Sequence, residues 1–144
     1  MSIAQNSPSI CVCALPGGQA TRVYALGSTG LIREFCQDSV DGPWYQGALD
    51  QKHQGSGSVS AVAYTNAAGV NVIEVYTIYA SRINCYVWDG RSWSGGRTAN
   101  YGQDHVFASR ESGRTVLLTR NPAAEVLYQL TSSGLKVGPG PSLS

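Results

Sequence analysis

The chain has 144 residues, of which 13% are charged, and its formal net charge at pH 7 is +1. This length is enough for one domain with a core of its own. The sequence has no cluster of Lys and Arg residues, which argues against a nucleic-acid partner. No apolar run approaches the roughly 18 residues of a membrane-spanning helix, which argues against membrane insertion.

Residues 1–13 read MSIAQNSPSICVC. They lack the basic segment followed by an apolar segment that defines a secretory signal. We therefore expect a protein that is cytoplasmic or is exported without a recognisable signal peptide.

The four cysteines are Cys11, Cys13, Cys36 and Cys85. They form no C-x-x-C pair and no Cys/His cluster with the spacing of a metal site. We expect free, mostly buried thiols, with a disulfide as the alternative, and the sequence gives no reason to expect a metal or a cofactor.

Short runs of β-branched and aromatic residues follow one another along the chain, separated by Gly, Ser, Asn and Asp. Long windows with helical periodicity are absent. Strands are predicted over 9–15, 21–27, 31–37, 44–49, 58–65, 71–79, 83–89, 93–98, 104–110, 114–120, 125–131 and 134–138. Many short strands with turns every 8 to 12 residues or so are typical of an all-β sandwich, barrel or propeller.

A repeat favours the propeller. Three segments show the same order of four strands, opening with ICVCAL, SVSAVAY and HVFASR. Four strands in about 45 residues are the signature of a propeller blade. The prediction is a single all-β domain over 1–144, with three blades of antiparallel strands at roughly 8–50, 57–98 and 104–141.

Three blades cannot close a ring, because a propeller needs about four to eight. A fragment of three blades would expose two apolar, unpaired flanks. We therefore expect self-association that closes the ring, with a homodimer of six blades favoured over other copy numbers.

Two segments carry a family resemblance: TRVYALGSTGLIREFCQDSVDGPWYQGA, residues 21–48, and VIEVYTIYASRINCYVWDGRSWSGG, residues 72–96. Together they resemble the six-bladed fucose-specific lectins of the Aleuria aurantia type, including the short bacterial members that self-assemble to complete the ring. The family pattern is an Ile-Arg-Val-Tyr strand, a Glu-x-Cys-Trp-Asp-Gly hairpin and then x-x-Trp-x-x-Gly-Ala. The resemblance is good over residues 20–96 and weak over 105–140.

The resemblance implies where a sugar would bind. In that family each fucose lies between neighbouring blades, where one blade gives an arginine, a glutamate and a small residue and the next gives two aromatics. Carried over position by position, the implied sugar-binding residues are Arg22, Glu34 and Ala48 of the first blade and Trp88 and Trp93 of the second.

The other blades depart from the pattern. In the second blade Glu74 stands at the arginine position and Cys85 at the glutamate position, so we expect its site to be lost. In the third blade Arg114 and Glu125 have nearly the spacing of the first pair, and Trp44 of a partner copy would supply an aromatic. These three residues are candidates for a second, weak sugar site.

The residue types themselves suit a deoxy sugar. An indole face can cover the C–H face of the ring, and apolar area then leaves water. Arginine donates and glutamate accepts hydrogen bonds, so together they can satisfy adjacent hydroxyls. Alternatives stay open at this point: Trp88 and Trp93 as packing residues only, and Arg22 with Glu34 as a structural ion pair.

The predicted function is therefore a non-catalytic lectin whose partners are L-fucose and fucosylated glycans. One alternative is a propeller that serves as a protein–protein interaction scaffold without sugar binding, because fold does not fix function. Another is a glycosidase using Glu34 and Glu125 as paired carboxylates, but these residues belong to separate predicted blades.

Overall fold

The computed structural model describes residues 10–26, 31–49, 58–79, 82–99, 105–120, 125–131 and 134–137. Within these residues twelve strands form three antiparallel sheets of four strands, and each sheet is made of consecutive strands. The described residues contain no helix long and apolar enough to cross a membrane. The all-β prediction is confirmed.

The first sheet contains β1 (Ile10–Ala14), β2 (Thr21–Leu26), β3 (Ile32–Gln37) and β4 (Trp44–Gln46). The second contains β5 (Val59–Thr65), β6 (Asn71–Tyr79), β7 (Arg82–Trp88) and β8 (Trp93–Ala99). The third contains β9 (His105–Glu111), β10 (Arg114–Arg120), β11 (Glu125–Thr131) and β12 (Gly134–Val137). These strands follow the three expected blades, except that β8 ends at Ala99, one residue beyond the expected second blade. The blade boundaries stay predictions.

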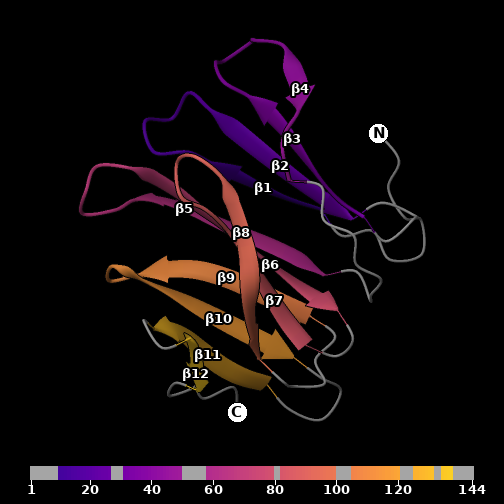
Figure 1. The fold of residues 1–144 in the computed structure, drawn as a ribbon, viewed down its shortest axis with the longest axis vertical. Helices are drawn as coiled ribbons and strands as arrows, with labels where there is room; N and C mark the ends of the chain where they lie inside the picture. Colours follow the sequence, from indigo (N-terminus) through magenta and orange to yellow (C-terminus); the bar gives the residue numbers. More distant parts are fainter. Residues whose placement is uncertain are drawn as a thin grey trace.

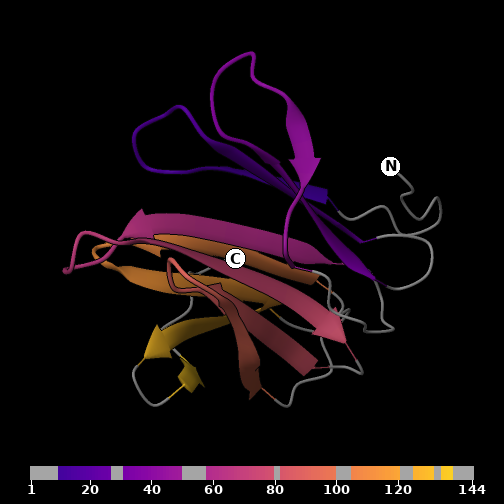
Figure 2. The same ribbon diagram turned by 45° about the horizontal axis from the view of Figure 1, so that its top comes forward.

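The sheets succeed one another in space as they do in sequence. Strand β5 contacts β1 on one side and β9 on the other, so the opening strands of the three sheets are neighbours. Figures 1 and 2 show the second sheet between the other two. Radial four-stranded sheets with adjacent opening strands are the arrangement of propeller blades.

Where the connections between strands are described, turns join them, and the turn between β9 and β10 follows directly from the sequence. Ser112 and Gly113 form the two-residue turn between β9 and β10, where Glu111 pairs with Arg114. Both turn residues have positive φ, 51° and 76°. This is the backbone of a type I′ turn, whose twist matches that of the two strands it joins.

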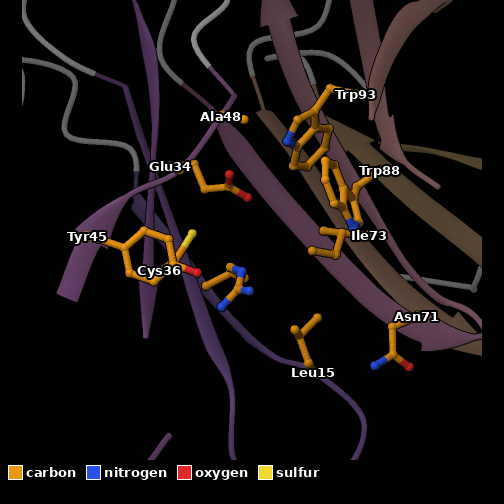
Figure 3. A pocket seen from close by; sticks show the side chains of 11 residues that line it. Leu15, Glu34, Cys36, Tyr45, Ala48, Asn71, Ile73, Trp88 and Trp93 are labelled. Atoms are coloured by element: carbon orange, nitrogen blue, oxygen red, sulfur yellow. The ribbon is translucent and has the colours of Figure 1, made fainter. Parts of the chain in front are cut away.

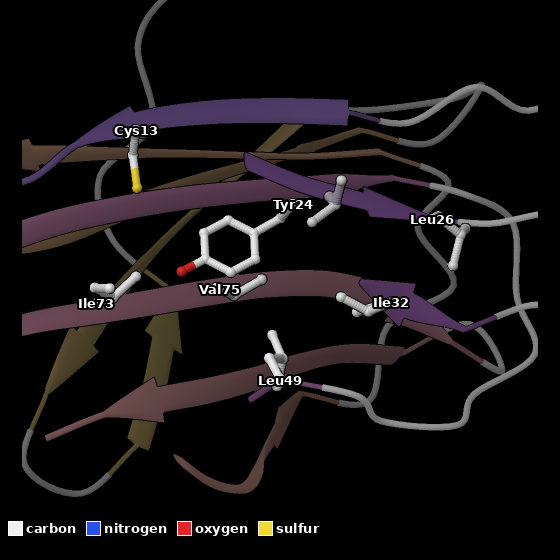
Figure 4. Packing of buried hydrophobic residues seen from close by; sticks show 8 residues of the cluster. Cys13, Tyr24, Leu26, Ile32, Leu49, Ile73 and Val75 are labelled. Atoms are coloured by element: carbon white, nitrogen blue, oxygen red, sulfur yellow. The ribbon is translucent and has the colours of Figure 1, made fainter. Parts of the chain in front are cut away.

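The core consists of two apolar layers, one on each face of the second sheet. Between the first and second sheets lie Cys13, Tyr24, Leu26, Ile32, Leu49, Val59, Ile73 and Val75 (Figure 4). Between the second and third sheets lie Val62, Tyr76, Ile78, Ile83, Cys85, Val106 and Leu117. Successive strand residues point to opposite faces, so Val75 and Tyr76 enter different layers.

The four cysteines are free, as predicted, and three of them are buried while Cys11 is partly buried. Burial raises the pKa of the Cys13 thiol to about 11. It raises the pKa of Cys11 to about 12, with the neighbouring Cys13 as a smaller cause. These groups are therefore neutral thiols at physiological pH and behave as small apolar side chains.

A candidate site between the first and second sheets

A pocket of about 220 Å³ opens between the first and second sheets. Its lining residues are Leu15, Arg22, Glu34, Cys36, Tyr45, Gly47, Ala48, Asn71, Ile73, Trp88 and Trp93. All five residues of the expected sugar site are among them. Figure 3 shows the two indoles on one side of the pocket and Glu34, Cys36 and Tyr45 across from them.

The strand register explains the polar wall. Arg22 pairs with Cys36, and Tyr24 pairs with Glu34, so these positions share the face of the first sheet that turns to the second. Glu34 is only 4% exposed. Its Oε2 accepts a 2.7 Å hydrogen bond from the Tyr24 hydroxyl, and its Oε1 accepts one of 3.5 Å from the Leu49 amide.

Arg22 and Glu34 both reach the pocket, but the structure gives them different partners. The guanidinium of Arg22 forms its ion pair with Asp38, at 3.0 Å from Nη2 to Oδ1. Its Nη1 donates to the carbonyl oxygens of Thr21 and Gln37, at 3.0 and 3.4 Å. The alternative of a structural Arg22–Glu34 ion pair is therefore not what the structure shows, and both groups keep hydrogen-bonding capacity toward the pocket.

Burial shapes the electrostatics of this wall. Desolvation, followed by the charge of Glu34, raises the pKa of Tyr24, so its hydroxyl stays a donor to the carboxylate. The same two causes raise the pKa of Cys36 to about 11. Cys36 therefore offers the pocket a neutral, weakly polar surface at physiological pH.

The aromatic wall comes from the hairpin of β7 and β8. Trp88 and Trp93 pair across the ladder, with ring centroids 5.8 Å apart and planes tilted by 51°. Trp93 also meets Tyr24 edge to face, at 6.1 Å and 82°. Both indoles are partly buried against the core between the first and second sheets. Trp88 and Trp93 therefore pack against the core and also line the pocket.

The turn of this hairpin is held by Asp89, whose carboxylate accepts hydrogen bonds from the Arg91 and Ser92 amides at 2.8 and 3.0 Å. These two bonds lower the pKa of Asp89. Gly90 provides the positive φ of 98°. The Asp-Gly pair thus fixes the turn, and the turn fixes the two indoles.

The segment after β4 brings Gly47 and Ala48 against the carboxylate of Glu34. The Gly47 amide donates to the Glu34 carbonyl at 2.8 Å. A β-carbon at position 47 would lie 2.0 Å from Oε1 of Glu34. A larger side chain at position 47 would therefore displace the site carboxylate. Strand β4 ends at Gln46, earlier than the predicted strand over 44–49.

Sequence reasoning missed several lining residues, among them Tyr45, Asn71 and Ile73. Tyr45 pairs with Cys36 in the ladder between β3 and β4. Alternation along β4 could have placed it on the site face. Asn71 and Ile73 enter because β6 packs against the first sheet, a contact that no motif in the sequence signals.

The junction of the second and third sheets has a different content. Glu74 is 2% exposed. Its Oε1 accepts hydrogen bonds from the hydroxyls of Tyr76 and Thr115, at 2.8 and 2.6 Å. Its Oε2 accepts one from the Tyr64 hydroxyl. Glu74 stands where the family pattern has an arginine. Its carboxylate already accepts hydrogen bonds from three hydroxyls of this chain.

The third-sheet residues of this junction extend the network. The guanidinium of Arg110 donates to Oγ1 of Thr115 at 3.0 Å and lies 3.6 Å from the centroid of the Tyr64 ring. Desolvation, followed by the hydrogen bond to Glu74, raises the pKa of Tyr64 to about 12. The junction is thus a closed polar cluster that links the two sheets.

The strand register does not assemble the second candidate site. Arg114 pairs with Glu111 at the first residue of β10, and Glu125 pairs with Arg120 at the other end of that strand. Six strand residues separate the two positions, roughly 20 Å along the sheet. The grouping of Arg114, Glu125 and Trp44 of a partner into one sugar site stays a prediction, which this register does not favour.

The two Arg/Glu pairs differ because spacing in sequence does not fix position in the ladder. In the first sheet Arg22 and Glu34 lie on adjacent rungs of one face, because Tyr24, two residues after Arg22, pairs with Glu34. In the third sheet Arg114 and Glu125 have almost the same spacing in sequence. Glu125 nevertheless pairs with Arg120, at the end of β10 that is far from Arg114.

Radial four-stranded sheets with a pocket between two of them define a β-propeller protein, and a pocket built from two indoles, a guanidinium and a carboxylate is typical of carbohydrate binding. The sequence comparison gives the particular family. The profile of the fungal fucose-specific lectins matches residues 2–135, and the chain belongs to this family. None of the curated sequences compared with the chain matches it significantly.

Solved structures agree with this fold. A fucose lectin from Kordia zhangzhouensis in complex with methyl-fucoside aligns with 89% of this chain and 97% of its own, at 24% identity and a TM-score of 0.66. The six-bladed Aleuria aurantia lectin aligns with the whole chain but with 49% of its own length, at 19% identity and a TM-score of 0.79. SapL1 lectin with alpha methyl fucoside shares 25% identity, over 90% of this chain and 46% of its own, with a TM-score of 0.70.

The chain thus spans about half the length of two of these relatives and nearly all of the third. The likeness identifies its three sheets as β-propeller blades and relates them to half of a six-bladed ring.

Proposed function

We propose that the chain is a non-catalytic lectin that binds L-fucose and fucosylated glycans between its first and second sheets. The observation that carries the proposal is the convergence of Arg22, Glu34, Ala48, Trp88 and Trp93 on one pocket. Membership in the fucose-specific lectin family supports it. So do relatives whose structures contain methyl-fucoside.

The pocket offers each part of a 6-deoxy sugar a matching surface. The indoles of Trp88 and Trp93 would cover the apolar C–H face, and Ala48 and Ile73 leave an apolar wall for the methyl group. Arg22 and Glu34 would bind adjacent hydroxyls by charge-assisted hydrogen bonds. A pocket of about 220 Å³ suits a monosaccharide, since pockets for drug-sized ligands begin at about 300 Å³.

The same geometry disfavours catalysis by paired carboxylates. Glycosidases hold two carboxyl groups about 5 to 10 Å apart. Glu34 lies on β3 and Glu125 on β11, in sheets that flank opposite sides of the second sheet. Incubation with fucosides should therefore release no free fucose.

Ring closure by a second copy completes the proposal. The outward face of the first sheet exposes Ile10 and Val12, which are 49% and 65% exposed. The outward face of the third sheet has an apolar groove that includes Phe107, Val116 and Leu118. Because the chain aligns with 49% of a six-bladed lectin, these faces would meet between two copies.

Titration calorimetry with methyl α-L-fucoside tests the lectin proposal. We expect saturable binding in wild type and a loss of affinity of at least about tenfold in Trp88→Ala, since the lost contact removes apolar burial. Val40→Ala is the control, because Val40 is an exposed apolar residue outside the pocket. Wild-type protein that binds no fucosylated glycan would refute the proposal in favour of the scaffold.

Two further sugars test the role of the methyl group. D-arabinose has the ring configuration of L-fucose without the methyl, and L-galactose carries a hydroxyl on that carbon. D-arabinose should bind about fourfold more weakly, as expected for one lost buried methyl group. L-galactose should also lose affinity, because its extra hydroxyl would meet an apolar wall.

A further inference from the structure

The turn that leads into β4 differs from its counterpart in the second sheet. In the second sheet residues 89–92 lie between the paired Trp88 and Trp93. In the first sheet residues 38–43 lie between the paired Gln37 and Trp44, so this turn is longer by two residues. The same four-strand plan thus gives two turns of different length beside one pocket.

The aspartates that begin these turns have different partners. Asp89 accepts hydrogen bonds from amides of its own turn. The longer turn is closed without Asp38. The Gly42 amide donates a 3.0 Å hydrogen bond to the Ser39 carbonyl, and the Gln37 side chain donates one of 3.0 Å to the Gly42 carbonyl. The carboxylate of Asp38 is therefore available for groups outside the turn.

Asp38 joins two residues that line the pocket. Its Oδ1 lies 3.0 Å from Nη2 of Arg22 on β2. Its Oδ2 accepts a 2.7 Å hydrogen bond from the hydroxyl of Tyr45 on β4. The hydrogen bond from Tyr45, and next to it the contact with Arg22, lower the pKa of Asp38. One carboxylate thus spans β3 and ties its two neighbouring strands together at the pocket rim.

We propose that Asp38 is a positioning residue for sugar binding, which holds the guanidinium of Arg22 and the ring of Tyr45 in place before the sugar arrives. A long arginine side chain loses much rotamer freedom when it binds a ligand, and a partner that fixes it beforehand removes this cost from binding. The inference rests on the proposed function, since it concerns the same pocket.

A purely structural role predicts a different behaviour. The side chain of Asp38 is 62% exposed in its ion pair, and exposed ion pairs contribute little to the stability of the fold. Substitution of Asp38 should therefore change affinity for the sugar while the unfolding temperature stays nearly constant. A residue that only stabilised the turn would change the unfolding temperature first.

The first experiment measures the Kd of methyl α-L-fucoside and the unfolding temperature of four proteins. Asp38→Asn should weaken binding about tenfold, and Tyr45→Phe by a smaller factor, because charge-assisted hydrogen bonds are lost in both. Asp41→Asn is the matched control: it removes a carboxylate of the same turn, and asparagine tolerates the positive φ of 63° at that position. The control should bind as wild type.

A double-substitution cycle shows whether Asp38 acts through Arg22. In an Arg22→Lys background, Asp38→Asn should have a much smaller effect than in wild type, because the fixed guanidinium is already gone. An equal effect in both backgrounds, wild-type affinity of Asp38→Asn, or a matching fall in unfolding temperature would overturn the inference. If wild type itself binds no fucoside, the proposed function fails and this inference fails with it.

Discussion

At the scale of single residues, the pocket depends on its polar groups and also on the close approach of Gly47 to the carboxylate of Glu34. Glu34 is buried, and its carboxyl oxygens accept hydrogen bonds from the Tyr24 hydroxyl and the Leu49 amide. Gly47 leaves the room that this carboxylate needs. The site is therefore preorganised by the first sheet, and substitutions that move Glu34 should act like substitutions of Glu34 itself.

Gly47→Ala tests this clearance. The new methyl group would overlap the Glu34 carboxylate, so the side chain must move out of its position beside Tyr24. We expect the Kd for methyl α-L-fucoside to rise at least about tenfold, as for a lost charge-assisted hydrogen bond. Gly95→Ala is the control, because its β-carbon would meet Tyr86 at the milder distance of 3.1 Å. Unchanged affinity in Gly47→Ala would contradict the role given to Glu34.

At the scale of strands and sheets, the second junction explains why the same blade plan need not give a second sugar site. Glu74 accepts hydrogen bonds from hydroxyls of the second and third sheets, so its carboxylate joins them. Glu74, which would disfavour a sugar at this junction, instead supports the contact between the second and third sheets.

Substitutions at Glu74 measure this contribution. Glu74→Ala leaves three buried or partly buried hydroxyls without their acceptor, and each such loss costs about 1 to 3 kcal/mol. We expect a fall in the free energy of unfolding of about 3 kcal/mol or more by urea denaturation. Glu74→Gln keeps one oxygen acceptor and should lose less. Equal, small losses in both variants would show that the cluster does not hold the sheets together.

The sequence predicted the strands well, because alternation and turn residues are local signals. Ser112-Gly113 and Asp89-Gly90 mark turns that the structure contains. Arg22 and Glu34 were predicted from the family resemblance, whose motif lies within one pair of strands. The second pair, Arg114 and Glu125, stays a prediction, because ladder register, not spacing, decides which residues meet and it places the two apart. The partners of Asp38 and Glu74 depend on turn length and on contacts between sheets, which no local pattern encodes.

At the scale of the whole molecule, the proposed assembly depends on the two outward faces of the first and third sheets. Light scattering should give twice the 15.2 kDa of one chain. Phe107→Asp and Val12→Asp place a charge on the third-sheet and first-sheet faces and should each shift the protein toward monomer. Val40→Asp is the control, because Val40 is exposed on a turn. A wild-type monomer would contradict ring closure by two copies.

A closed ring would carry the pocket once in each copy. Such a ring would bind a surface rich in fucosylated glycans more tightly than one pocket binds a single glycan. Two pockets on one rigid ring can engage neighbouring glycans on a surface, and the second contact is then intramolecular. Surface-bound fucosylated glycan should therefore hold the dimer longer than it holds the Phe107→Asp monomer, although both should have the same Kd for free methyl α-L-fucoside.

The central claim is that fucose lies between the first and second sheets, and a crystal structure of the protein saturated with methyl α-L-fucoside tests it most directly. We predict one sugar per chain, with its C–H face on Trp88 and Trp93 and its hydroxyls on Arg22 and Glu34. A sugar found beside Glu74, or only at the contact between copies, with this pocket empty, would contradict the claim.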